Sequence, residues 1–275
     1  MTLDEQVNSY GILLTEEERD EVGIKLEELL RFGFTTIESG LSVNDLDDIR
    51  KKLADVYARQ LEEIGGSVTL EASHDADVAR CLLAYETCFF DLATNKPLLG
   101  FCRRLFGDNF VLLQQNGLMN HPVRSHYQLR WHRDLPFQHW VCSMPIAISA
   151  LLCVDEFNAT TGGTYVLAGS HLHEKFPSDA FVRRHQQVMD AHPGTFILMD
   201  AMVFHRAGKN SSTSVRRAVN HLIGRPFLAQ QIDIPRMLGS THAHDPAVSN
   251  YLGYQWGPAA SVTAWRKHRS KRKVT

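Results

Sequence analysis

Cysteine is scarce in this sequence. The chain of 275 residues has five cysteines, at positions 81, 88, 102, 142 and 153. Their number is odd and no two of them have the Cys-x-x-Cys spacing, which argues against a disulfide framework. This usage is typical of a reducing compartment, and we expect a cytoplasmic protein.

Long hydrophobic runs are also missing. No apolar stretch approaches the ~20 residues that a membrane-spanning helix needs, and the first residues, 1–5, are acidic and contain no apolar signal segment. The net charge is only −2, so no overall charge attracts the chain to nucleic acid or to a membrane surface. We therefore expect neither nucleic acid nor a membrane as a partner.

Positive charge is concentrated at the C-terminal end. Residues 266–273 read Arg-Lys-His-Arg-Ser-Lys-Arg-Lys. Such a run is usually a solvated tail, and we expect residues 266–275 to be disordered. Binding of the run to nucleic acid or to another anionic surface is the alternative.

The hydrophobic pattern predicts helices first and strands later. Apolar residues recur at helical spacing in 16–32 and 43–64, and glycine follows each stretch. The mostly polar stretch 67–80 is expected to be a loop. From residue 109 onward, short apolar runs such as 145–154 alternate with turn signals. Many short strands favour a β-sandwich or barrel with the helices packed on one side, and no composition break divides the chain into two domains.

A histidine and an aspartate stand two residues apart, at His132 and Asp134. If residues 126–134 end in extended backbone, these two side chains leave the same face and aim at one point. A third metal ligand must come from far along the chain, and His205, just past an apolar run, is the candidate. Two histidines and one carboxylate leave three positions open on an ion, which is the arrangement of non-haem Fe(II) oxygenases. A chain with this many histidines and aspartates is expected to contain roughly one His-x-Asp by chance, so the pair needs further support.

Two adjacent arginines follow His205 after eleven residues, at Arg216 and Arg217. In a strand over residues 215–227 they point to opposite faces, so one of them faces the core. A buried guanidinium needs an anionic partner. The carboxylate of a bound ligand would satisfy it through two parallel hydrogen bonds, and a buried Asp or Glu would do so equally.

Taken together, these residues resemble the phytanoyl-CoA dioxygenase family. The resemblance lies in Trp131-His132-Arg133-Asp134, in the turn and strand 161–171 that end in Gly-Ser-His, and in His205 followed by Asn210 and Arg216. It covers residues 20–230. It implies a mainly β fold with flanking helices, a double-stranded β-helix (jelly roll, cupin-like) whose N-terminal helices pack on one sheet, in a single domain over residues 1–265.

The resemblance also implies a reaction and residue roles. The family consists of Fe(II)- and 2-oxoglutarate-dependent oxygenases, so His132, Asp134 and His205 would be the catalytic iron ligands. Arg216 would hold the distal carboxylate of 2-oxoglutarate, and Gln115 is a candidate contact for its other end. The expected reaction consumes O2, hydroxylates an unactivated C–H bond of a small organic molecule and releases succinate and CO2. The carboxylate of Asp134 disfavours halogenation, because the related halogenases have a small residue there.

Two further residues beside the ligand pair, Arg130 and Gln138, are candidate substrate contacts, Arg130 for an anionic group. Two other functions remain open on the same fold. A cupin-like isomerase or epimerase would use a metal as a Lewis acid without O2 and would not need Arg216 for a keto acid. A non-catalytic binding module would not need the complete set of metal ligands.

Overall fold

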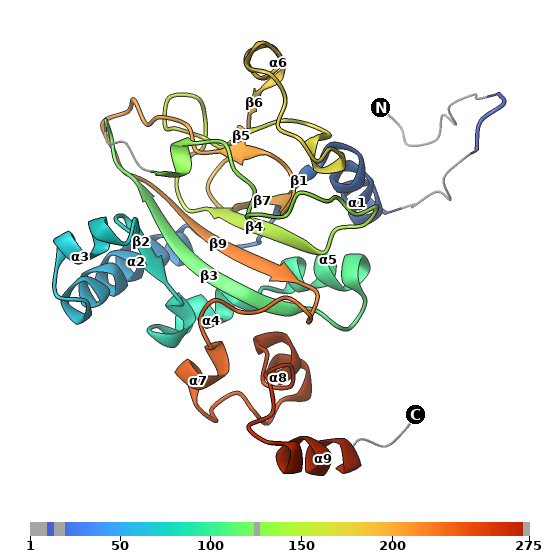
Figure 1. Ribbon diagram of the computed structural model, residues 1–275. Coiled ribbons are helices and arrows are strands. Elements are labelled where there is room, and N and C mark those ends of the chain that lie inside the picture. Colours follow the sequence, from blue (N-terminus) through green and yellow to red (C-terminus); the bar gives the residue numbers. More distant parts are fainter. Residues whose placement is uncertain (1–9, 14–19, 124–126, 272–275) are drawn as a thin grey trace.

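Two antiparallel sheets form the centre of the computed structural model, which describes residues 10–13, 20–123 and 127–271 (Figure 1). The larger sheet has the strand order β1-β7-β4-β9-β3-β2, and the smaller sheet has the order β6-β5-β8. The strands are β1 (Phe34–Glu38), β2 (Val78–Arg80), β3 (Val111–Asn120), β4 (Ala147–Cys153), β5 (Tyr165–Val166), β6 (Gln187–Val188), β7 (Thr195–Asp200), β8 (His205–Arg206) and β9 (Arg216–Gly224). This is the expected cupin-like architecture, and the larger sheet does not close into a barrel.

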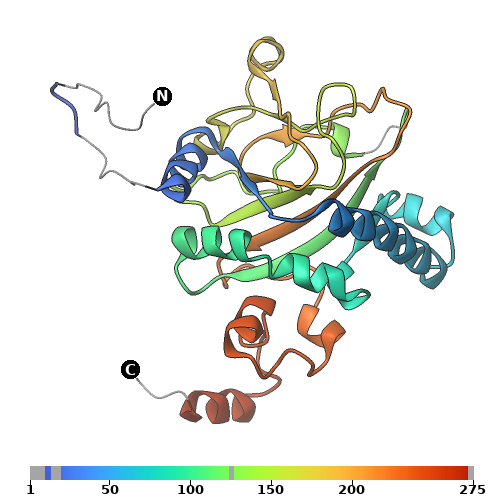
Figure 2. The ribbon, with the colours of Figure 1, turned by 180° about the vertical axis from the view of Figure 1, so that it is seen from behind.

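Helices flank the larger sheet. The α-helices are α1 (Glu21–Phe32), α2 (Val43–Glu63), α3 (Ser67–Ala72), α4 (Thr87–Ala93), α5 (Lys96–Phe106), α6 (Asp179–His185), α7 (Ile234–Leu238), α8 (Pro246–Leu252) and α9 (Val262–Lys271). Figure 2 shows α2, α4 and α5 across the back of the larger sheet, opposite the face toward which the small sheet lies. The prediction that N-terminal helices pack on one sheet is confirmed.

The helix α2 shows how the sequence builds this layer. A capping box of Ser42 and Asp45 fixes its first turn. Its residues Leu46, Leu53 and Val56 recur at helical spacing and are buried in the core against the sheet. Gly117 of β3 lies beneath Leu53, where an added Cβ would stand 2.1 Å from a Leu53 methyl carbon. The glycine therefore lets the helix approach the sheet closely.

Three expected boundaries change in the structure. The stretch 67–80 is not a plain loop, because it contains α3 and β2. The helix predicted over 16–32 begins at Glu21 with Asp20 as its N-cap, and residues 16–19 lie outside the described part. Of the tail predicted to be disordered, residues 266–271 belong to α9, and 272–275 lie outside the described part. None of the helices in the described ranges combines the length and the apolar composition of a membrane span.

A hydrogen bond of the Ser261 side chain to the Ala264 amide explains why the tail begins as a helix. One turn further on, the Arg269 guanidinium lies 5.3 Å from the centre of the Trp265 ring. The described side chains of α9 are exposed. Because the helix buries no face, its sequence lacks the apolar residues at helical spacing from which a helix could have been predicted.

The helix-facing side of the larger sheet buries a histidine, His221 of β9. Its Nδ1 donates to the Ala150 carbonyl at 3.3 Å, so its Nε2 accepts from the Gln115 amide at 2.9 Å. Burial without an acidic partner lowers the pKa of His221 to about 4. The imidazole is therefore neutral at pH 7.

We expect this histidine to make the metal-free protein less stable in acid. The unfolded state takes up the proton near pH 6.5 and the folded state only near pH 4, so stability is complete above pH 6.5 and falls between the two values. The loss should approach about 3 kcal/mol at pH 4. Urea unfolding of the wild type and of His221→Gln between pH 4 and 7 measures it. The low pKa of His221 is contradicted if the free energy of unfolding of the wild type falls no more steeply with decreasing pH than that of the variant.

Candidate functional site

Three metal-ligating side chains meet beside the small sheet. His132 pairs with His205 of β8 in an isolated antiparallel bridge, with N–H···O distances of 3.0 and 3.1 Å in the two directions. The amide of Asp134 donates to the Ala201 carbonyl at 3.0 Å. The segment around residue 132 is therefore not a regular strand, but its backbone is fixed on both sides of the ligand pair.

The ligand atoms form one cluster. The Oδ1 of Asp134 lies 3.6 Å from the Nε2 of His205 and 4.0 Å from the Nε2 of His132. The two imidazole rings are 4.4 Å apart between their centres. One ligand atom from each residue lies within 4.8 Å of the others, so the cluster could hold a metal ion. The structure thus brings together the three residues that the sequence indicated.

The backbone sets the tautomer that each imidazole has when it is neutral. The Nδ1 of His132 lies 2.8 Å from the Arg130 carbonyl oxygen. The Nδ1 of His205 lies 3.1 Å from the Val203 carbonyl oxygen. A carbonyl only accepts hydrogen bonds, so each Nδ1 carries the hydrogen and each Nε2 presents a lone pair to the cluster. Neutral imidazoles in this tautomer are the form that binds metals.

The carboxylate between the rings is held in its charged form. Burial alone would raise the pKa of Asp134, but the imidazoles of His205 and His132 outweigh burial and lower it to about 2. Burial lowers the pKa of His205, but the charge of Asp134 raises it by more, so the pKa of His205 lies above its ordinary value. The Oδ2 of Asp134 is buried and has no hydrogen-bond partner among the described residues. A divalent cation would satisfy this oxygen, because a buried charge is costly when it is unpaired.

The two arginines of β9 separate as the strand period predicts. Arg217 lies on the helix-facing side and pairs with Asp155 at 3.0 Å. Arg216 points the other way, toward the small sheet, and is 5% exposed. Its Nη2 donates to the Gly162 carbonyl at 3.1 Å, whereas its buried Nε has no partner in the described part of the chain. Burial lowers its pKa to about 10. No described carboxylate forms an ion pair with Arg216, whose guanidinium carbon lies 4.2 Å from the centre of the Phe157 ring, so it could still bind the carboxylate of a ligand.

A glycine turn supports Arg216. Gly162 has a φ of 79°, and an added Cβ would stand 2.5 Å from the Gly208 carbonyl oxygen. Gly208 in turn donates its amide to the Gly163 carbonyl at 3.0 Å. Only glycine allows this contact between the two turns. The glycines of the 161–171 motif therefore fix the carbonyl that Arg216 binds.

The predicted role of Gln115 is corrected by its position. Its side chain lies on the helix-facing side of the larger sheet, away from the metal-ligand cluster. The amide accepts from the Leu83 N–H at 2.8 Å and donates to the Phe89 carbonyl at 2.7 Å and to His221. It joins β3 to the helices and is not placed to touch a keto acid at the cluster.

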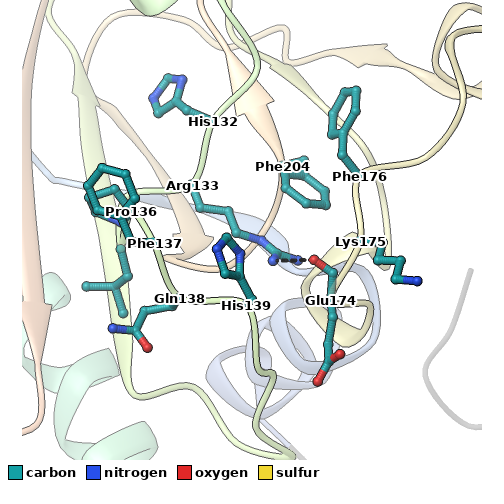
Figure 3. Close-up of a pocket in the computed structure, with 11 residues that line it drawn as sticks. His132, Arg133, Pro136, Phe137, Gln138, His139, Glu174, Lys175, Phe176 and Phe204 are labelled. Atoms are coloured by element: carbon teal, nitrogen blue, oxygen red, sulfur yellow. Dashed lines mark hydrogen bonds between the residues drawn. The ribbon is translucent and has the colours of Figure 1, made fainter.

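A cavity of about 600 Å³ opens beside His132 (Figure 3). It is lined by His132, Arg133, Leu135, Pro136, Phe137, Gln138, His139, Glu174, Lys175, Phe176 and Phe204. Gln138 thus lies where a substrate contact was expected. Arg130 is exposed and is not among the lining residues in the described part of the chain. Its contribution to the site is the carbonyl that orients His132.

Sequence reasoning missed Arg133, which stands between the two ligands of the first pair. Its buried guanidinium donates to the carbonyl oxygens of Met202 at 2.7 Å, Glu174 at 3.0 Å and Ser170 at 3.1 Å, and also to that of His173. These bonds tie two distant segments to the backbone of the metal ligands. Backbone carbonyls carry no residue-type signature, so the sequence offered no signal for this role.

The fold and the cluster together define a class. Two imidazoles and one carboxylate are the metal ligands of non-haem Fe(II) oxygenases. Here they lie in a fold of two antiparallel sheets. A family model described as phytanoyl-CoA dioxygenase (PhyH) matches residues 29–218, and the chain belongs to this family. Family membership supports an oxygenase that depends on Fe(II) and 2-oxoglutarate.

Two curated proteins are similar to large parts of the chain. The uncharacterized protein Rv1501 of Mycobacterium tuberculosis is 30% identical over 213 residues, which are 75% of this chain and 77% of that protein. The multifunctional dioxygenase prhA of Penicillium brasilianum is 30% identical over 174 residues, 57% of this chain and 54% of that protein.

Solved structures share the fold. EctD from S. alaskensis, crystallised with 2-oxoglutarate and 5-hydroxyectoine, superposes with a TM-score of 0.62 at 20% identity, covering 78% of this chain and 80% of that chain. EvdMO1 gives a TM-score of 0.59 at 17% identity, covering 76% of this chain and 51% of that chain. At such identities the likeness concerns the architecture, and it confirms the predicted fold class.

Proposed function

We propose that the protein is an Fe(II)- and 2-oxoglutarate-dependent dioxygenase that hydroxylates an unactivated C–H bond of a small organic molecule. The observation that carries this proposal is the cluster of His132, Asp134 and His205, in which one ligand atom of each residue lies within 4.8 Å of the others. Substrate, O2 and 2-oxoglutarate would give hydroxylated product, succinate and CO2.

Each residue of the site has a distinct task in this proposal. His132, Asp134 and His205 would hold the iron, and Arg216 would bind the distal carboxylate of 2-oxoglutarate through the guanidinium edge that carries Nε. Fe(II), when bound, supplies the chemistry that couples oxidation of a C–H bond by O2 to oxidative decarboxylation of the keto acid. The cavity beside His132 would hold the substrate and limit access of water.

Anaerobic spectroscopy tests the proposal. Purified protein mixed with Fe(II) and 2-oxoglutarate should show a weak visible charge-transfer band if His132, Asp134 and His205 hold the iron with open positions for the keto acid. Metal binding without the band, and with no effect of Arg216→Ala, would favour a Lewis-acid isomerase or epimerase of the cupin type. Absence of specific metal binding would favour a non-catalytic binding module. Release of succinate on admission of air would then report turnover.

A further inference from the structure

The cavity beside His132 has a wall of apolar side chains. Leu135 and Pro136 come directly after the metal-ligand pair and line the cavity together with Phe176 and Phe204. Figure 3 shows the two phenylalanines across the cavity from Pro136. The rings of Phe176 and Phe204 meet edge to face with their centres 4.9 Å apart. Such a wall offers contact area to a carbon skeleton but no hydrogen bond.

Arg133 is the buried charged residue of the wall, and most of its hydrogen-bond donors are already paired with backbone carbonyls. Of the five N–H donors of a guanidinium, Arg133 uses four on backbone carbonyls. Its central carbon also lies 3.8 Å from the centre of the Phe204 ring. Arg133 is therefore a positioning residue that fixes the wall, and it has little capacity left for an anionic substrate.

The other acidic and basic side chains of the lining have opposite charges and are exposed to solvent. Glu174 and Lys175 are adjacent, exposed and of opposite sign. In Figure 3 the amine of Lys175 points away from the two phenylalanine rings. Lys175 is the one exposed Lys or Arg among the described lining residues, so this part of the chain does not concentrate the positive charge that a phosphate-bearing coenzyme thioester would require.

Two aromatic side chains of the cavity lining are exposed. Phe137 is 91% exposed and has a φ of 65°, a left-handed conformation that is unfavourable for a bulky residue. Phe176 is 42% exposed. Apolar surface gathered at a cavity mouth marks a binding site, because burying it against an apolar ligand is favourable.

We propose that the substrate is an uncharged, largely apolar molecule whose carbon skeleton packs against Leu135, Phe176 and Phe204, an inference that rests on the proposed function. The cavity volume of about 600 Å³ lies within the range of roughly 300–1,000 Å³ typical of sites for drug-sized ligands. A zwitterionic, amino-acid-like solute would find no charged partner on the apolar wall itself, and Glu174 and Lys175 of the lining are exposed to solvent, where a salt bridge contributes little.

Binding of the neutral apolar dye Nile red tests the inference. The dye is titrated into anaerobic protein loaded with Fe(II) and 2-oxoglutarate, and its fluorescence gives the affinity. Phe176→Ala should weaken binding about tenfold, because it removes part of the aromatic wall, and Phe176→Leu should restore part of the loss. The matched control is Phe227→Ala, which removes a 72% exposed ring that is not part of the cavity, and it should bind the dye as the wild type does.

Competition separates the substrate classes. Borneol, a neutral terpenoid alcohol, should displace the dye, whereas L-proline and octanoyl-CoA should not at the same concentration. Equal dye affinity of Phe176→Ala and Phe227→Ala, or stronger displacement by the charged competitors, overturns the inference. The charge-transfer band of Fe(II) and 2-oxoglutarate is recorded on every variant without any competitor. Loss of that band in the wild type would defeat the proposed function, whereas its presence beside a failed dye test defeats only the apolar substrate.

Discussion

Asp134→Ala is expected to abolish turnover and to lower the affinity for Fe(II) by more than about 100-fold, since removal of a mere partner of a ligand already costs about 10–100-fold. Asp134 is the anionic member of the cluster, and both imidazoles lie within 4.0 Å of its Oδ1. Without it the ion keeps two neutral ligands. The fold should survive, because the main chain of Asp134 is held by the bond of its amide to the Ala201 carbonyl, which alanine keeps.

Two further variants define the cause of that loss. Asp134→Asn keeps the shape of the side chain but removes its charge, so it should lose most of the metal affinity. Asp179→Ala removes an exposed carboxylate from α6, with 88% of its side chain accessible, and should behave as the wild type. Metal titration, succinate release and thermal melting are measured on all three. Wild-type activity in Asp134→Ala would remove Asp134 from the ligand set.

The parts of the site that follow a simple period could be predicted from the sequence. The helical spacing of Leu46, Leu53 and Val56 correctly gave the buried face of α2. The alternation of a strand correctly separated Arg216 from Arg217, although it did not say which one faced the ligand. Each of these inferences needs only a few residues of regular backbone.

The position of Gln115 could not be predicted, because a β-bulge lies upstream of it. The register of β3 against β9 shifts between Leu112 and Gln114. Simple alternation from Leu112, which faces the helices, would place Gln115 on the opposite side, toward the ligands. The extra residue reverses the faces of the strand, so Gln115 faces the helices instead. Sequence patterns do not reveal where such an irregularity falls.

The other large effect is expected for Arg216→Ala, which should raise the 2-oxoglutarate requirement about 100-fold through loss of a charge-assisted bidentate contact worth a few kcal/mol. Binding of Fe(II) alone should be unaffected. Arg216→Lys should lie between the two, because a single ammonium cannot form the parallel pair of bonds. Succinate release as a function of 2-oxoglutarate concentration, and the concentration that half-saturates the charge-transfer band, both measure the effect.

Arg217→Ala provides the matched control, because it removes the same charge one residue away on the opposite face. It breaks the ion pair with Asp155 and should leave the 2-oxoglutarate requirement unchanged. Stability separates ligand binding from a structural role. Arg216 is buried without an ion-pair partner among the described residues and contacts only the Gly162 carbonyl and the Phe157 ring in the interactions observed, so its removal should leave the ligand-free protein folded. If Arg216→Ala instead unfolds the ligand-free protein, or if Arg217→Ala produces the loss of 2-oxoglutarate binding, then Arg216 supports the fold and another residue anchors the keto acid.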